Sequence, residues 1–341
     1  MSKLLVSPAP HASAGGSTRR IMLDVLIALL PATVMAIVFY GYKVAVLAVV
    51  CCLSACAAEL CFGIVKNLKF KWKDIKEGVK SSSVWDCSCF VTGLLLALNL
   101  STETPWWLAL LGSVFAIVIV KMLFGGIGRN FINPALAGRI FVLLCLVRAL
   151  NAVAPGTSWL GEQATAATWL GERSAENIKL LPMLIGETGT AAVGETSAIA
   201  LLIGGIYLAV RRVIDWKIPV VILAGTALFA LLFDAIPNAP AAQWGSVVAA
   251  HLLSGGLLLG ALFMATDYAT SPNTTVGTVI YACGIALLVV VIRVFSALPE
   301  GVSFAIVIMN IVAVLLDRYL RPRYFGEPKP EKKAKAKEVE A

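Results

Sequence analysis

Long runs of apolar residues are the feature that most limits what this chain can fold into. The runs include residues 23–40, 44–65, 218–232 and 277–292, and most approach the ~17–25 residues that a helix needs to cross a bilayer. A transmembrane β-barrel would show segments of about ten alternating residues, and these runs do not alternate. With 59% hydrophobic and 14% charged residues, the chain is predicted to be an all-α polytopic membrane protein. Nucleic-acid readout and a disulfide scaffold are excluded.

The eight cysteines and two histidines do not predict a metal site. The cysteines fall in or at the edges of apolar segments, where a thiol behaves as a small buried hydrophobe. Cys51, Cys56 and Cys61 lack the CxxC spacing of metal sites, and neither histidine belongs to a ligand cluster. We therefore expect no metal to be bound by this chain alone.

Ten apolar segments are predicted to cross the membrane. Their approximate bounds are 22–40, 44–65, 87–100, 105–123, 134–153, 196–210, 218–235, 247–265, 277–294 and 302–317. The third segment is short and a glycine-rich stretch follows the fourth, which indicates interrupted or re-entrant helices. We expect a transmembrane domain over 22–325, a cytoplasmic N-terminal segment over 1–21, and a disordered Lys-rich cytoplasmic tail over 326–341.

Lysine and arginine residues are concentrated on one side of this predicted arrangement. They precede the first segment, follow the second, fourth and sixth segments, and fill the C-terminal tail. Because basic loops stay in the cytoplasm, both termini are predicted to be cytoplasmic. The long loop 154–195 then faces outward, and it is acidic, with five glutamates against one arginine and one lysine. Arg293, inside the ninth segment, is expected to snorkel to the interface.

A short repeated sequence predicts that the two halves of the chain are related. The sequence TGLLLA at 92–97 resembles GGLLLG at 255–260, and each is followed by a polar turn that contains a proline. The copies belong to the third and eighth segments, which are five apart, so the two five-helix repeats would be inverted. Inverted repeats with interrupted helices place binding sites near the midplane. Chance similarity between two leucine- and glycine-rich helices is the alternative.

Two segments are too polar for their apolar surroundings. GGIGRNFINPA at 125–135 has three glycines in a turn whose free amides can hold an anion or the edge of a cofactor. FMATDYATSP at 263–272 places an acidic group at a membrane boundary, where such groups are functional candidates. The candidate site residues are Arg129, Asn130, Asn133, Thr266 and Asp267. The structural alternatives are a tight re-entrant turn and a helix cap by Asp267.

Four motifs in the same order resemble the NqrB/RnfD family. They are GGIGRNFINPALAG at 125–138, GETSAIALLIGGIYL at 194–208, FMATDYATSP at 263–272 and EGVSFAIVIMN at 300–310. The similarity runs from near residue 5 to about residue 325 and includes SPAPH at 7–11. This family comprises the RnfD membrane protein of the Rnf complex, an ion-translocating ferredoxin:NAD oxidoreductase, and the NqrB membrane protein of the sodium-pumping NADH:quinone reductase.

The resemblance implies an FMN that a flavin transferase links to a threonine through a phosphoester bond on the outer, periplasmic face. The counterpart of the family's attachment motif is TAATWL at 165–170, so Thr168 is the predicted acceptor. Thr188, Thr190 and Thr196 are rivals on the same loop. The charge asymmetry places this loop outside without reference to the family. A riboflavin or second flavin, bound non-covalently near the central polar turns, is also implied.

The implied function is electron transfer through this flavin while Na⁺ or H⁺ crosses the bacterial inner membrane. The implied partners are the other Rnf subunits, which are integral membrane and iron–sulfur or flavin proteins, and the lipid bilayer. Because a flavin itself exchanges electrons, the chain needs no acid–base constellation, and we expect no complete catalytic site on it alone.

Two alternatives remain at this point. The NqrB protein of the quinone reductase usually carries a longer N-terminal extension, whereas about 21 residues precede the first segment here, which favours Rnf. A small-solute channel or transporter belongs to a different class, because the family resembles urea-transporter-like folds and inverted repeats also build pores.

Overall fold

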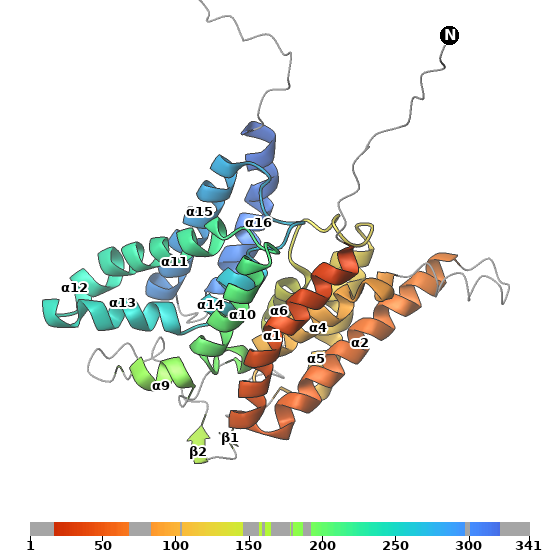
Figure 1. Cartoon of the computed structure of the whole chain (residues 1–341), viewed down its shortest axis with the longest axis horizontal. Helices are drawn as coiled ribbons and strands as arrows, with labels where there is room; N and C mark the ends of the chain where they lie inside the picture. Colours follow the sequence, from red (N-terminus) through yellow and green to blue (C-terminus); the bar gives the residue numbers. More distant parts are fainter. Residues whose placement is uncertain are drawn as a thin grey trace, which may run out of the picture.

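Figure 1 shows the computed structural model of the chain, in which helices dominate. The structure describes residues 17–67, 83–102, 104–145, 157–158, 161–164, 178, 180–186, 192–296 and 301–320. Within these residues, each of the ten predicted apolar segments contains helix. The prediction that the chain is mostly helical is therefore confirmed.

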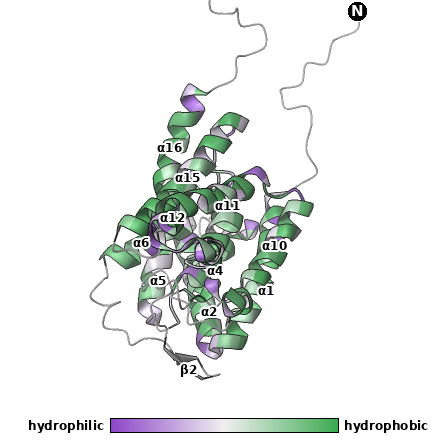
Figure 2. Ribbon diagram, turned by 90° about the vertical axis from the view of Figure 1, so that its left-hand side faces the viewer, coloured by the Kyte–Doolittle hydropathy of each residue, from purple (hydrophilic) through white to green (hydrophobic). Residues whose placement is uncertain are grey.

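Five helices among the described residues are long and apolar enough to cross a membrane unaided. They are α1 (Thr18–Tyr40), α2 (Tyr42–Asn67), α11 (Lys217–Ala230) with its extensions η5 (Leu231–Ala235) and α12 (Ile236–Asn238), α15 (Thr275–Phe295) and α16 (Val302–Tyr319). On α1, Leu23, Ile27 and Leu30 are exposed, at the spacing that puts residues on one helical face. Hydrophobic residues cover these helices (Figure 2), which suits contact with lipid.

The remaining apolar segments are bent or short. A helix formed by η6 (Ala241–Gln243) and α13 (Trp244–Leu253) is bent by 57° against α14 (Leu257–Leu259) and η7 (Gly260–Met264), and this pair is a sixth candidate span. The shorter apolar helices are α4 (Ser88–Asn99), α5 (Trp106–Phe115) continued by η2 (Ala116–Met122), α6 (Pro134–Cys145) and α10 (Ala198–Val210). By length the described residues thus provide five or six spans. Ten crossings in two inverted repeats, with urea-transporter-like architecture, stay a prediction.

Small elements connect these helices. They are η1 (Ser83–Asp86), the strands β1 (Thr157–Ser158) and β2 (Gly161–Ala164), α9 (Leu180–Ile185) and η4 (Val193–Glu195). The two strands pair antiparallel, with Thr157 opposite Ala164, so the predicted outer loop contains a hairpin that an all-α prediction does not include. Most of this loop, residues 1–16 and residues 321–341 lie outside the described residues, and the predicted domain bounds stay predictions.

Close packing of helices in a membrane depends on small residues, because the hydrophobic effect does not drive helices together within lipid. A Cβ atom at Gly204 of α10 would overlap the carbonyl oxygen of Ala28 on α1. A Cβ atom at Gly93 of α4 would lie 2.8 Å from the carbonyl oxygen of Cys51 on α2. The α1–α10 and α2–α4 contacts therefore require glycine at these positions.

We predict that Gly204→Ala destabilises the fold, because the added methyl group forces α1 away from α10. Overpacking of this kind costs about 1–3 kcal/mol. Gly245→Ala is the matched control, since no atom lies within 4 Å of a Cβ at that position. Thermal unfolding of the two purified variants measures the difference. Equal melting temperatures would show that α1 and α10 leave room for a methyl group at Gly204.

Candidate functional site

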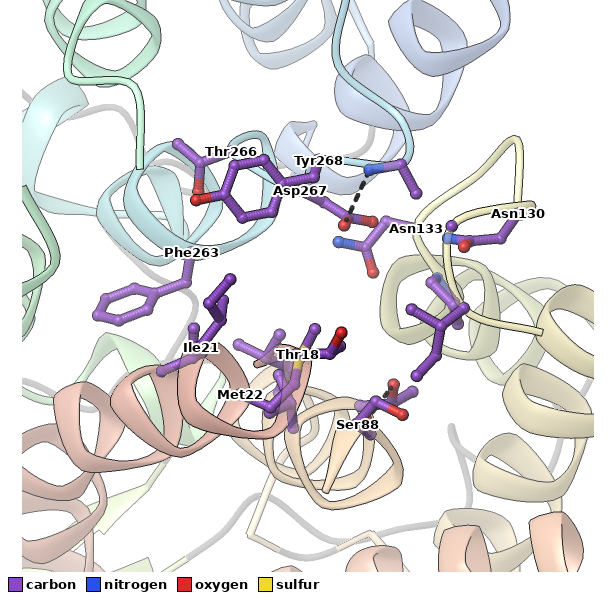
Figure 3. Close-up of a pocket in the computed structure, with 18 of the residues that line it drawn as sticks. Thr18, Ile21, Met22, Ser88, Asn130, Asn133, Phe263, Thr266, Asp267 and Tyr268 are labelled. Atoms are coloured by element: carbon purple, nitrogen blue, oxygen red, sulfur yellow. Dashed lines mark hydrogen bonds between the residues drawn. The ribbon is translucent and has the colours of Figure 1, made fainter. Parts of the chain in front are cut away.

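A cavity of about 320 Å³ lies between the starts of α1 and α4, the end of α10 and η7. Its apolar walls are Ile21, Met22, Val25, Val91, Leu95, Ile127, Leu208, Val213, Ile214 and Phe263, and its polar lining includes Thr18, Ser88, Thr92, Lys121, Asn130, Asn133, Thr266 and Asp267. Figure 3 shows Asn133 and Asp267 on the side opposite Thr18 and Met22 of α1. A largely apolar cavity of this size with a few polar groups is typical of a site for a small molecule or cofactor.

A glycine turn between η2 and α6 forms one edge of the cavity. Gly125, Gly126 and Gly128 have φ values of +110°, +93° and +79°, a region that side chains other than glycine's rarely adopt. The tight turn predicted from the sequence is therefore present. It ends at Asn130, whose Nδ2 donates to the carbonyl of Ile132 at 3.2 Å and whose side chain is buried.

Asn133 joins this turn to the end of η7. Its Oδ1 accepts a hydrogen bond from the N–H of Ala135 at 3.0 Å, so it caps the start of α6 immediately before Pro134. Its Nδ2 donates to the carbonyl of Met264 at 3.1 Å. The two polar segments found in the sequence, 131 residues apart at this contact, are thereby held together.

Thr266 and Asp267 lie in the turn that follows η7. The hydroxyl of Thr266 donates to the carbonyl of Leu262 at 2.9 Å, and Asp267 Oδ1 accepts from the N–H of Ala269 at 3.3 Å. Burial raises the pKa of the Asp267 carboxyl, and the hydrogen bond from Ala269 partly opposes this. The helix cap considered for Asp267 is wrong, because Thr274 caps α15.

Four of the six predicted site residues come together at the cavity. Asn130, Asn133, Thr266 and Asp267 line it. Arg129 is exposed on the glycine turn and does not line the cavity, since its side chain lies along Gly125. Thr168 lies outside the described residues. The roles of all six in holding a cofactor stay predictions.

The structure adds Lys121 to the cavity wall, a residue that is not among the candidates from the sequence. Its Nζ lies 2.8 Å from Glu59 Oε2 and donates to Ser88 Oγ at 2.6 Å. Both charged side chains are almost fully buried. Lys121 therefore contributes nothing to the charge of a loop, and the useful signal was the lone glutamate inside the apolar run 44–65.

Arg293 does not snorkel to the interface, as the sequence had suggested, but is 1% exposed. Its guanidinium donates to the carbonyls of His251, Ser254 and Gly255 at 2.6–3.1 Å. These carbonyls lie at the end of α13, where the break before α14 removes their helical partners. A positive charge is favourable at a helix C-terminus, so Arg293 stabilises the break.

A second buried arginine, Arg139 of α6, connects three interior elements. Its Nη1 donates to Asn99 Oδ1 at 3.0 Å and to Ser303 Oγ at 2.9 Å. Glu195, in η4, is also buried, and its carboxylate interacts electrostatically with both Arg139 and Arg293. A charged residue inside or beside an apolar segment was the sequence signal for both.

Comparison with known proteins gives the same family as the sequence motifs. A model of the NQR2, RnfD, RnfE family matches residues 5–326. The D subunit of the Na(+)-translocating ferredoxin:NAD(+) oxidoreductase complex of Acetobacterium woodii is 41% identical, with 98% of each chain covered. The D subunit of the ion-translocating oxidoreductase complex of Stutzerimonas stutzeri is 36% identical, covering 91% of this chain and 92% of the relative. The D subunit of the proton-translocating ferredoxin:NAD(+) oxidoreductase complex of Clostridium ljungdahlii is 32% identical, covering 94% and 96%.

We predict that Lys121→Met destabilises the fold by about 3–5 kcal/mol, because it removes the Lys121 ammonium from its 2.8 Å contact with the buried Glu59 carboxylate. The double variant Lys121→Met/Glu59→Gln removes both charges and is expected to recover most of this loss. Thermal unfolding of the single and double variants measures it. A double variant as unstable as Lys121→Met would contradict the ion-pair interpretation.

Proposed function

Because the chain belongs to the NQR2, RnfD, RnfE family, we propose that it is the flavin-carrying, RnfD-type membrane component of an ion-translocating ferredoxin:NAD oxidoreductase complex. The names of relatives that match over more than nine-tenths of both chains support this proposal. The helices suited to a membrane agree with it. In this role the chain is one subunit of an enzyme complex, and Na⁺ or H⁺ crosses the membrane as electrons pass through it.

The first flavin is an FMN attached to Thr168 through its phosphate. The motif at 165–170 and the position of the acidic loop opposite the basic loops support this assignment. A phosphoester bond would keep the cofactor permanently at the outer face. Attachment requires a flavin transferase as an additional partner during maturation.

A second flavin, held without a covalent bond, suits the cavity lined by Asn133 and Asp267. An isoalloxazine ring is planar and apolar on its faces and polar along one edge. The apolar walls with Phe263 match the faces, and the polar groups of the two turns match the edge. A bound flavin would supply one- and two-electron exchange. The residues of this chain position it and exclude water.

The cavity is suited to positioning a flavin because its polar side chains are held in place before a flavin binds. Asn133 is held by hydrogen bonds to two separate elements, and Asp267 by its own turn. Within the described residues no cluster of three or more metal ligands is present. We assign the iron–sulfur centres that deliver or accept electrons to partner subunits, which are integral membrane and iron–sulfur or flavin proteins.

Two of the cysteines in the described part of the chain agree with this division of roles. Cys51 and Cys89 are fully buried in apolar packing. A buried thiol in such surroundings is chemically inert. The chain itself would then contribute cofactor binding and a path across the membrane.

We predict that Thr168→Val abolishes covalent flavin. The full chain is co-expressed with its flavin transferase and its denatured gel band is examined for flavin fluorescence under ultraviolet light. Wild type and the loop control Thr188→Val are expected to fluoresce equally. Fluorescence that persists in Thr168→Val would place the attachment elsewhere. A wild-type band without fluorescence would contradict the flavin-carrying role and favour a solute channel or transporter.

We predict that Ile127→Trp lowers non-covalent flavin content by about tenfold, corresponding to about 1.4 kcal/mol, because the larger side chain fills the cavity. Leu123→Trp is the control, since Leu123 is exposed on the same turn and does not line the cavity. Both are made on the Thr168→Val background, and the flavin released on denaturation is measured. Equal flavin content in the two variants would exclude the cavity as the site.

A further inference from the structure

A basic pocket lies where α1 begins and α10 ends. Its volume is about 290 Å³, and it is lined by Arg20, Ile21, Asp24, Arg211, Arg212, Val213 and Tyr268. Three arginines and one aspartate thus line the pocket. None of these four charged residues lines the cavity proposed for the flavin.

Asp24 neutralises only one of the three arginines. Nη2 of Arg211 lies 3.2 Å from both Asp24 oxygens, and the hydroxyl of Tyr207 donates to Asp24 Oδ1 at 3.1 Å. Among the residues the structure describes, no carboxylate lies within 4.0 Å of Arg20 or Arg212. The first turn of α1 contains no acidic residue, so the positive end of its dipole adds to the charge. The pocket therefore keeps a net positive charge.

The turn after α10 holds Arg212 at this position. Its φ is +55°, and in the described residues Cys87 is the other non-glycine residue with a positive φ. The turn is fixed by backbone hydrogen bonds from Arg212 to Ala209 and from Val213 to Leu208, and by the Tyr268 hydroxyl, which donates to Val213. A disfavoured conformation that persists is held by its surroundings, as is common in binding sites.

A separate apolar groove lies farther along the same two helices. Its volume is about 470 Å³, and it is lined by Ile27, Leu30, Pro31, Val34, Met35, Ile185, Ser197, Ile199, Ala200 and Ile203. It begins seven residues after Arg20, or about 10 Å along α1. The surface between pocket and groove is also apolar, with Leu23 40% and Ile206 62% exposed. Figure 1 and Figure 2 both show α1 and α10 side by side.

We propose that the α1–α10 seam binds one anionic phospholipid, with its headgroup phosphate on Arg20 and Arg212 and an acyl chain on the groove. Arginine suits phosphate because its planar donors bind two oxygens at once. Basic pockets between helices on the cytoplasmic side are suited to anionic headgroups, and the charge asymmetry of the sequence assigns this end of α1 to that side. The apolar groove below the charges favours a lipid over a free anion.

Native mass spectrometry of the full chain tests this. The protein, in neutral detergent, receives equal amounts of phosphatidylglycerol and phosphatidylcholine with matched acyl chains. Wild type is expected to retain phosphatidylglycerol preferentially. Arg20→Gln/Arg212→Gln is expected to reduce this preference by about fivefold for each arginine removed. The matched control Lys66→Gln/Arg318→Gln removes two exposed positive charges from α2 and α16 and is expected to keep the preference.

Two further measurements distinguish a bound lipid from a bound simple anion. Ile27→Asn/Ile203→Asn in the groove is expected to lower retention of phosphatidylglycerol, and excess inorganic phosphate is expected to leave wild-type retention unchanged. Displacement by phosphate, with no effect of the groove variant, would show a simple anion site and overturn the proposal. Equal retention of both lipids by wild type, or an equal loss in the Lys66/Arg318 control, would also overturn it. Melting temperatures of all variants confirm that each is folded.

Discussion

In an apolar medium, a backbone carbonyl or N–H that loses its helical partner costs several kcal/mol, and this chain interrupts its helices in its interior. At two of these interruptions a side chain restores lost hydrogen bonds. Arg293 donates to three carbonyls at the break after α13. Asn133 caps α6 and donates to the carbonyl at the end of η7. The candidate site exists because these contacts make irregular backbone stable inside the protein.

The buried charges follow the same constraint. Removing an ion from water is expensive unless a partner lies within contact distance, and Lys121 meets Glu59 at 2.8 Å. Arg139 interacts electrostatically with Glu195 and donates to the oxygens of Asn99 and Ser303, which links α4, α6 and α16. Such contacts specify one arrangement of helices that apolar packing alone would leave loosely defined.

The two ligand proposals use different parts of this framework. The flavin cavity lies between polar turns whose side chains are fixed before any ligand arrives, which reduces the entropy lost on binding. The proposed lipid seam lies on the outside of α1 and α10, which are in close contact at Gly204. A headgroup at Arg20 would also lie next to the cavity, since Ile21, Val213 and Tyr268 line both pockets.

The sequence by itself determined the membrane class, the helical segments and the two polar turns, because apolar run length and glycine or proline spacing are local properties. It also identified the family, through motifs that the chain retains in order. The partnership of Lys121 with Glu59 and the position of Arg293 were decided only by tertiary structure. Both depend on which residues distant in sequence become neighbours, and a charge in an apolar run looks the same whether it faces lipid, water or a buried partner. The sequence could not place the side chain of Arg129 either, because a glycine turn can direct that side chain away from the cavity that its neighbours line.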